Sequence, residues 1–341
     1  MQRGTSYPAI RDNDMREQVV PLPPSDEQQR IVEAIEAQFT RLDAGVAALK
    51  RLRANLKRYK AAVLKAACEG NLVEQDPDDE PASELLKRIL KERRAKWAAE
   101  QRAKGKDPHK LTYKEPAAPD TTDLPDLPEG WVWATIDMVA ECLDRFRVPI
   151  NKKERATRKG NIPYYGANGQ VGWIDDYLFD EPLVLVVEDE TFTGREKPFS
   201  YKIEGKSWVN NHAHILRAIA VDIDYLNYSL AFYPFTPLTT GTTGRRKLTQ
   251  QALMQAEYAL PPINEQERIV GEIEKLLSIT DDLELMIEHS IQRAERLRQS
   301  ILREAFAGRL VPQDPNDEPA GELLKRIRRD RARQTNGKKR R

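Results

Sequence analysis

The 341-residue chain has few cysteines and no long apolar run, and each shortage excludes a class of protein. Its two cysteines, Cys68 and Cys142, are too few for a disulfide framework and are typical of a reducing cytoplasm. No apolar stretch approaches the ~18 residues that span a bilayer, and no apolar signal segment follows Met1. We therefore expect a cytoplasmic protein without a membrane partner. A net charge of +1 excludes a uniformly basic surface, although basic residues cluster locally.

The sequence also lacks recognisable catalytic and metal-binding patterns. No segment resembles a nucleophile–base pair or a phosphate-binding glycine loop. The acidic stretch 186–197 lacks the Asp…Glu-x-Lys arrangement of a nuclease metal site, and His212 with His214 lacks a third zinc ligand. The tetrapeptide NIPY at 161–164 resembles the catalytic motif of adenine methyltransferases, but no cofactor-binding glycine turn precedes it. We expect no catalytic residue, no metal and no cofactor in this chain.

The chain does contain a long internal repeat. The phrase LPPSDEQQRIV at 22–32 returns as LPPINEQERIV at 260–270. Aligned without a gap, residues 23–89 and 261–327 are identical at 29 of 67 positions. Two copies are fewer than the roughly three stacked units that a solenoid needs. The repeat therefore predicts a pair of similar arms that flank a different central segment.

Each arm is predicted to be one long helix. Asp26 and Asn264 are candidate N-caps, and Gly70 and Gly308 have the residue type that ends helices. Apolar residues recur every seven positions between these limits, a pattern that winds two helices around each other. The residues expected to pair are Ile35, Leu42, Leu49, Leu56 and Val63 in the first arm and Ile273, Leu277, Ile287, Leu297 and Ile301 in the second.

The arms can pair antiparallel within one molecule or exchange with the arms of a second molecule, and the sequence leaves both open. Between them lies a segment in which short strand-like runs at 182–188, 199–203 and 212–219 are separated by Gly and Asn turns. Helical runs at 222–232 and 249–255 are fewer. The predicted fold class is α+β, with one mixed globule flanked by two long helices that form an antiparallel coiled coil.

The expected organisation follows from these patterns. It comprises a short segment at 1–22, a first long helix at 23–70, a basic helix and polar linker at 71–126, a globular domain at 127–262, a second long helix at 263–309 and a basic C-terminal tail at 310–341.

With these motifs in place, the sequence resembles the specificity subunits of Type I restriction–modification enzymes. The resemblance covers nearly the whole chain and rests on the two LPP…EQ…RIV arms, LLKRILKERRAKW at 85–97, LPEGW at 127–131 and GTTGRRKLTQQAL at 241–253. It implies that the globule is a target-recognition domain for double-stranded DNA. It also implies partners, namely methyltransferase subunits docked on the helices and restriction/translocase subunits that join them. S-adenosylmethionine, ATP and Mg would then bind those partners.

The chain departs from the family pattern at its N-terminal end. Members usually have a recognition domain before each long helix, whereas about 22 residues precede the first arm here. The departure predicts a subunit that lacks most of its first recognition domain, with residues 1–22 as the remnant. A homodimer of such half-subunits, or a pair with another half-subunit, would restore a two-part target. The alternatives are a coiled-coil scaffold without sequence-specific DNA binding and, less favoured, an adenine DNA methyltransferase.

Recognition of this kind implies contacts to phosphates and to base edges. Arg and Lys suit phosphates and guanine edges, whereas Asn and Gln suit adenine edges. The expected DNA-binding residues of the globule are Lys152, Lys153, Arg155, Lys159, Asn168, Gln170, Arg195, Lys197, Asn210, Asn211, Arg245, Arg246 and Lys247. Arg158, Lys202 and Lys206 complete the basic clusters. The alternative for each cluster is an ordinary solvated surface.

Overall fold

The computed structural model describes residues 12–190, 192–195, 197–242 and 245–338. Residues 1–11, part of the short segment expected at 1–22, lie outside the described residues. The chain divides into two compact units: the first holds the described residues up to Leu56 and from Asp282 onward, and the second holds Lys57–Asp281. Among the described helices, none has the length and apolar character needed to cross a membrane.

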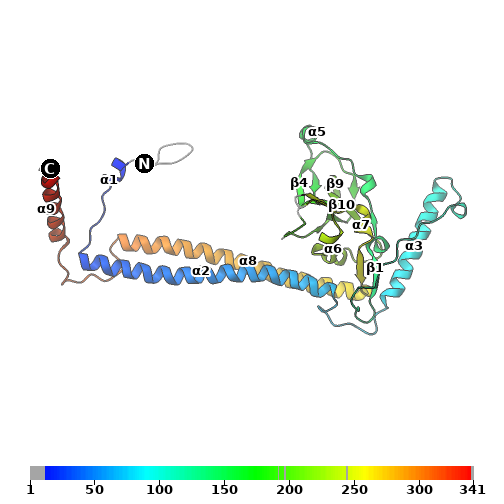
Figure 1. Ribbon diagram of the computed structural model, residues 1–341, viewed down its shortest axis with the longest axis horizontal. Coiled ribbons are helices and arrows are strands. Elements are labelled where there is room, and N and C mark those ends of the chain that lie inside the picture. Colours follow the sequence, from blue (N-terminus) through cyan, green and yellow to red (C-terminus); the bar gives the residue numbers. More distant parts are fainter. Residues whose placement is uncertain (1–11, 191, 196, 243–244, 339–341) are drawn as a thin grey trace. The chain divides into compact units, whose positions relative to one another are not determined.

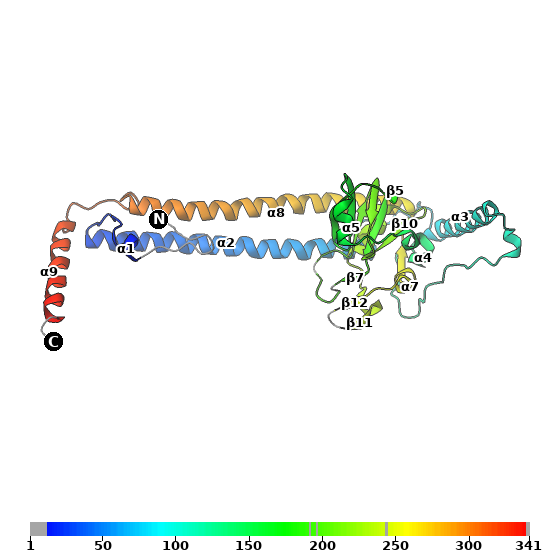
Figure 2. The same cartoon turned by 90° about the horizontal axis from the view of Figure 1, so that it is seen from above.

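Two helices of 44 residues, α2 (Ser25–Cys68) and α8 (Ile263–Phe306), lie side by side within one molecule (Figures 1 and 2). In the first unit Asp43 pairs with Arg298, and Arg53 pairs with Glu288 at 3.6 Å. In the second unit Lys60 Nζ lies 2.6 Å from Asp281 Oδ1. The position of the partner falls as the position along α2 rises, so the helices are antiparallel. The α+β fold class with two long antiparallel helices is confirmed, and the helices pair here within one molecule, one of the two arrangements that the sequence left open.

Burial follows the heptad pattern along most of both helices. Leu56, Val63, Ile273, Ile287 and Ile301 are all buried, and the remaining predicted residues Ile35, Leu42, Leu49 and Leu277 are partly buried. Thr280 is buried in the same row, where its hydroxyl donates to the backbone oxygens of Leu276 and Leu277. The apolar repeat therefore forms a continuous seam.

Leu297 is the exception, because its side chain is 49% exposed and lies outside the buried seam. The neighbouring Arg298 occupies the inward position and places its guanidinium carbon 4.7 Å from the centre of the Phe39 ring. Seam positions follow one another at alternating intervals of three and four residues. Arg298 lies three residues before Ile301 and occupies such a position, so Leu297 lies one residue before it and points away from the seam. The sequence assignment of Leu297 to the pairing face is therefore corrected.

Helices α2 and α8 begin and end at equivalent positions of the repeat. The residues predicted as N-caps, Asp26 and Asn264, lie inside the helices. Helix α8 begins at Ile263, so Asn264 lies inside the first turn and its amide donates to Asp79. At the other end, Gly70 and Gly308 have φ of +68° and +67°, the left-handed conformation in which glycine closes a helix. The predicted glycine ends of the arms are present.

A shorter helix follows each arm. Helix α3 (Ala82–Ala103) buries Ala82, Leu85 and Ile89 in the second unit. Helix α9 (Ala320–Lys338) is its repeat counterpart in the first unit. The C-terminal region predicted as a basic tail at 310–341 is therefore largely helical, as its GELLKRI sequence would have indicated by comparison with α3.

The globule in the second unit is built from small, mainly antiparallel sheets. One has the order β2-β10-β6-β8, a second β4-β3-β9-β5, a third β11-β12-β7, and β1 pairs with β13. Their bounds are β1 (Val132–Thr135), β2 (Ala140–Cys142), β3 (Ile162–Gly166), β4 (Gly169–Ile174), β5 (Phe179–Asp180), β6 (Leu183–Val187), β7 (Asp189–Glu190), β8 (Ser200–Ile203), β9 (Lys206–Val209), β10 (Ala213–Ala218), β11 (Thr240–Thr242), β12 (Arg245–Lys247) and β13 (Glu257–Leu260).

Short helices complete the described chain. They are α1 (Asp12–Arg16), α4 (Ile136–Val139), α5 (Lys152–Thr157), α6 (Ile223–Ala231) and α7 (Gln250–Met254), with 3-10 turns η1 (Pro108–Lys110), η2 (Asp144–Phe146) and η3 (Thr236–Leu238). Strands and helices thus lie where the sequence predicts them at 182–188, 199–203, 212–219, 222–232 and 249–255. The apolar run of β6 is buried at every position, as expected for a central strand covered on both faces.

The main core of the second unit joins the globule to the helix pair. Val63 and Ala67 of α2 and Ile273 of α8 belong to the same buried cluster as Trp131 and Tyr225 of the globule. The long helices therefore form part of the hydrophobic core on which the globule is built, which fixes the orientation of its loops relative to this end of the pair.

The seam register predicts different effects for two neighbouring apolar residues of the first unit. Ile301→Ala removes a side chain that is only 5% exposed, so we expect a loss of about 2–4 kcal/mol in unfolding free energy. Leu297→Ala is the matched control, and it should change stability by about 0.5 kcal/mol or less because the residue lies off the seam. Thermal and urea unfolding followed by circular dichroism would measure both. Equal losses would contradict the register.

Candidate nucleic-acid interface

Three loops of the globule meet at the end of the β3–β4 hairpin. Arg195, from the loop after β7, donates from Nη2 to Oδ1 of Asn168 in the hairpin turn at 2.7 Å. The backbone amide of Asn210 donates to the Tyr165 oxygen at 3.0 Å, and the Tyr201 hydroxyl donates to the Gly166 oxygen. These contacts hold together a set of polar side chains that we term the loop surface, comprising Asn168, Gln170, Arg195, Lys197, Asn210 and Asn211.

The hairpin turn itself is formed by Ala167 and Asn168, between the paired residues Gly166 and Gly169. Gly169 has φ of +105°, a conformation that glycine adopts without strain, and Asn168 precedes it at the exposed tip. Because Arg195 donates a hydrogen bond to the Oδ1 atom of Asn168, the side-chain NH2 group of Asn168 is the part that remains available to donate to a ligand. Gln170, Lys197 and Asn211 are also exposed. The structure therefore brings the amides onto one surface with Arg195 and Lys197, whereas two other basic residues predicted in the same cluster lie elsewhere: Lys202 binds Asp224, and Lys206 lies over the Tyr177 ring.

The first basic cluster lies elsewhere on the hairpin. Lys152, Lys153 and Lys159 are exposed on and after α5, whose first turn is capped by Asn151. Arg155 lies over the ring of Tyr164 at 4.7 Å. Arg158 donates to Asp175 beyond the end of β4 at 2.8 Å and covers the ring of Trp208. This cluster is therefore at the opposite end of the β3–β4 hairpin from Asn168.

The third basic cluster is used within the domain. Arg246 donates to the hydroxyl of Thr239 and to the backbone oxygens of Thr236 and Thr239. Lys247 Nζ lies 2.8 Å from Glu188 Oε1, and this contact raises the pKa of the lysine. The side chain of Arg245 lies outside the described residues. Both described cations of this cluster therefore fix β12 in place, whether or not they also contact a ligand.

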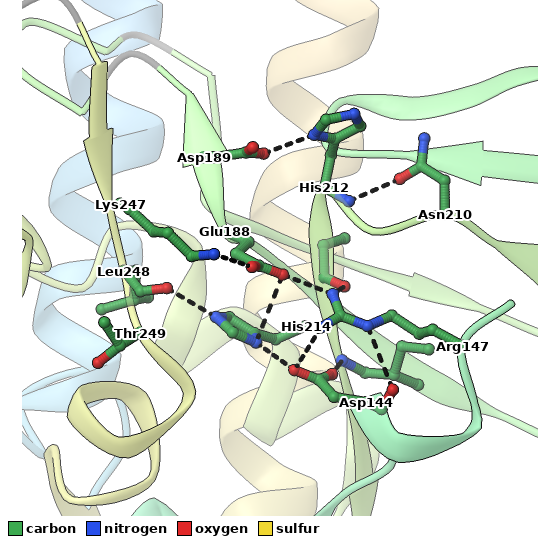
Figure 3. Close-up of polar contacts among 12 residues, drawn as sticks. Asp144, Arg147, Glu188, Asp189, Asn210, His212, His214, Lys247, Leu248 and Thr249 are labelled. Carbon is green, nitrogen blue, oxygen red and sulfur yellow. Dashed lines mark hydrogen bonds and ion pairs between the residues drawn. The ribbon is translucent and has the colours of Figure 1, made fainter. Parts of the chain in front are cut away.

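A buried polar network, which the sequence analysis did not predict, underlies β12 (Figure 3). His214 on β10 is 2% exposed, and its Nδ1 and Nε2 atoms lie 2.6 Å from Asp144 Oδ2 and 2.9 Å from the Leu248 oxygen. Arg147 binds both Asp144 and Glu188. Because Glu188 also binds Lys247, the network ties the ends of β2 and β6 to β12.

Two carboxyl groups of this network have lowered pKa values, and their partners explain why. Both ring nitrogens of His214 face oxygen atoms, one of the Asp144 carboxyl group and one of the Leu248 backbone. Burial would raise the pKa of Asp144, but the hydrogen bond and charge of His214, together with Arg147, lower it overall. Burial is likewise outweighed at Glu188, where hydrogen bonds from Lys247 and Arg147 lower the pKa. The network is a set of compensated buried charges.

Cys142, Asp144 and His214 place potential metal ligands within 4.8 Å of one another. Burial raises the pKa of the Cys142 thiol to about 12, so the thiolate that binds metals is disfavoured. Both His214 nitrogens are also hydrogen-bonded within the chain. These residues fit a structural anchor better than a metal centre.

Several features of the sequence take a different meaning in the structure. His212 is an exposed residue paired with Asp189 at 2.8 Å, whereas His214 is buried, so the two histidines have separate roles. Tyr164 of NIPY is 1% exposed and covered by Arg155, unlike an aromatic residue that stacks on a base. Glu188 directly follows an apolar strand, and that position was the available signal of a buried charge.

The network predicts how stability changes at low pH. Asp144 and Glu188 have lowered pKa values when folded, so their contribution is fully present above the ordinary carboxyl pKa values and is lost as pH falls through the folded values. Asp144→Asn should reduce unfolding free energy by about 1–3 kcal/mol at pH 7. The difference in unfolding free energy between this variant and the native protein should become smaller below a pH of about 4. Thermal unfolding at several pH values from 7 to 3 measures this difference. A difference that does not change with pH would contradict the lowered pKa of Asp144.

Comparison with known proteins finds similarity to specificity subunits of Type I restriction enzymes. Residues 128–293 match the family model described as the Type I restriction modification DNA specificity domain. The Type I restriction enzyme EcoEI specificity subunit of Escherichia coli is 28% identical, over 81% of this chain and 55% of that protein. The EcoDI specificity subunit of Escherichia coli is 25% identical, over 97% of this chain and 72% of that protein. The chain thus spans about half the length of the EcoEI relative.

A solved structure has a similar fold. It is described as "Structural basis underlying complex assembly and conformational transition of the type I R-M system" and superposes with a TM-score of 0.57 at 21% identity. The match covers 90% of this chain and 65% of that chain. At this level of identity the likeness concerns the fold alone.

Proposed function

We propose that this chain, whose residues 128–293 match the Type I restriction modification DNA specificity domain, recognises a double-stranded DNA sequence for a restriction–modification complex. The observation that carries the proposal is the family match at residues 128–293, which includes the globule and its loop surface. In this role the chain is non-catalytic. It positions partner subunits that bind S-adenosylmethionine, ATP and Mg and perform the chemistry on DNA.

The loop surface would read the bases. Asn168, Gln170, Asn210 and Asn211 carry amide groups that can pair with adenine edges, and Arg195 suits a guanine or a phosphate. The hydrogen bond from Arg195 fixes the amide of Asn168 before DNA arrives, which reduces the entropy lost on binding. The buried network beneath β12 would keep the neighbouring loops in place as the groove is entered.

Phosphate contacts would come from the exposed lysines of α5 and from Lys159, because no ion pair is found for Lys152 or Lys153 among the described residues. Such contacts set the register of a protein on a duplex without reading its sequence. The paired helices would dock methyltransferase subunits, and restriction/translocase subunits would join that core. Two copies, or one copy with another half-subunit, would then read a two-part target.

The phosphate contacts can be tested by a salt titration of DNA binding by the chain with its methyltransferase partner. Each phosphate contact contributes about 0.9 to the slope of log affinity against log salt. Lys152→Ala with Lys153→Ala should therefore reduce that slope by about 2. Lys110→Ala, at an exposed position of η1 outside the long helices, is the control and should leave the slope unchanged. An unchanged slope in the double variant would show that Lys152 and Lys153 do not contact phosphates.

The base contacts can be tested by sequencing methylated bases in host DNA with and without the gene beside its partner. Asn211→Ala should reduce methylation at the recognised sequence by about 5- to 150-fold, since a base-edge contact contributes ~1–3 kcal/mol. Thr121→Ala, exposed in the linker outside the long helices and the globule, should have no effect. If methylation does not depend on the gene, the chain is a scaffold and the proposed function is wrong.

A further inference from the structure

One apolar residue is exposed beside the amide groups of the loop surface. Val171 lies on β4, and its side chain is 50% exposed. The register of β3 against β4 shifts between Tyr164 and Tyr165, and Val171 is the residue of β4 that is left without a partner. It is therefore the extra residue of a β-bulge, a feature that redirects a side chain out of the regular strand pattern.

Gly166 allows the side chains of Val171 and Asn210 to approach the same point of the hairpin. A Cβ atom on Gly166 would be 3.3 Å from Cγ1 of Val171 and 3.0 Å from Nδ2 of Asn210. Carbon atoms pack at about 3.5–4.0 Å, so a side chain at this position would push its neighbours away. Because glycine has none, an apolar methyl group and an amide nitrogen meet there. We term Val171 and Asn210 the methyl–amide subsite.

The amide group of Asn210 has a fixed orientation. The backbone amide of His212 donates to the Oδ1 atom of Asn210 at 2.9 Å. A backbone N–H can only donate, so the side-chain oxygen must face His212 and the nitrogen must face Gly166. Among the residues that the structure describes, none accepts a hydrogen bond from this nitrogen. Asn210 is partly exposed, and it therefore presents an NH2 donor beside an exposed valine.

The major groove of DNA shows a different pattern of groups for each base. The NH2 group of Asn210 would find an acceptor on adenine, guanine or thymine but not on cytosine, which presents a donor there. Of the three bases with an acceptor, only thymine carries a methyl group, and this group lies next to its acceptor O4. Contact between that methyl group and Val171 would remove apolar surface of both from water. A donor beside an apolar side chain thus matches the edge of thymine.

We propose that the methyl–amide subsite reads a thymine of the recognised sequence in the major groove. Asn210 donates from Nδ2 to O4, and Val171 packs against the 5-methyl group. The inference rests on the proposed function and deepens it, because residue type alone indicates adenine for Asn210. A pairing with adenine through both atoms of the amide would need Oδ1 as the acceptor for N6, but Oδ1 already accepts from His212.

The test replaces thymine by uracil in duplexes bound by the chain together with its methyltransferase partner. Uracil keeps O4 and the pairing with adenine but lacks the 5-methyl group, so only the contact with Val171 is removed. Methylation sequencing gives the recognised sequence, and each thymine on either strand of it is then replaced in turn. At one position, uracil should weaken binding by about fourfold, the effect of losing the burial of one methyl group.

A second base analogue tests the hydrogen bond separately. At the same position, 5-methylcytosine paired with guanine keeps the methyl group but presents an amino donor in place of O4. Binding should weaken at least about fivefold, because the NH2 group of Asn210 then faces a donor and loses its acceptor. Binding that tolerates 5-methylcytosine would overturn the role of Asn210 in the subsite.

Val171→Ala should itself weaken binding of the thymine duplex by about fourfold. At the identified position it should respond to uracil by less than about 1.5-fold, because the methyl group has already lost its contact. Leu111→Ala is the matched control, since Leu111 is 40% exposed in the linker, and this variant should keep the full response to uracil. Each comparison is between two duplexes bound by one protein, so a change in folding of the variant does not imitate the result.

The possible failures can be told apart. Selective binding that is unchanged by uracil at every thymine of the recognised sequence overturns the thymine subsite and leaves the proposed function intact. Equal responses to uracil by Val171→Ala and the native chain at every position also overturn it, because Val171 would then not contact the methyl group. If duplexes of all sequences bind alike, the proposed function itself is wrong and the subsite falls with it.

Discussion

The antiparallel seam between α2 and α8 is the constraint on which the rest of the structure depends. It brings together segments that are more than 200 residues apart in sequence, through ion pairs such as Lys60–Asp281 and buried residues such as Ile273. In the second unit the same helices supply part of the hydrophobic core of the globule. The main core of the globule therefore includes residues of the long helices, whereas two smaller clusters, around Leu185 and Tyr164, are formed by the globule alone.

Within the globule, ion pairs connect separate strands, whereas at the seam apolar packing connects the two helices. Asp144, Arg147, Glu188 and His214 connect strands that come from separate regions of the chain, and Lys247 extends the network to β12. Breaking one member of such a network leaves the others buried without compensation. This arrangement ties the ends of β2 and β6 to β12.

The sequence predicted the parts of the structure that depend on local pattern. The glycine ends of both arms, strands such as β6 and β10, and helix α6 all lie where periodicity and turn residues place them. Leu297 was misassigned because Thr280 and other polar residues interrupt the apolar heptads, so hydrophobicity alone does not fix the register there. The network around His214 joins residues up to 71 positions apart, and no local signal indicates such pairings.

The candidate surface was predicted in composition but not in arrangement. The amides and Arg195 were identified from residue type, whereas their convergence depends on hydrogen bonds between loops, such as Arg195 to Asn168. Lys247 was identified as a cation, but its pairing with Glu188 depends on how β12 is placed against β6. Side chains of the same type thus differ in availability for reasons that only tertiary structure reveals.

The antiparallel seam also limits how such a chain can change in length during evolution. An insertion into α2 alone would displace Asp43 from Arg298 and every later pair along the helix. Equal insertions of one heptad into both helices would preserve the register while lengthening the pair by about 10.5 Å, since each residue adds 1.5 Å. Length variants of this architecture should therefore arise by coupled, heptad-sized steps in both repeats.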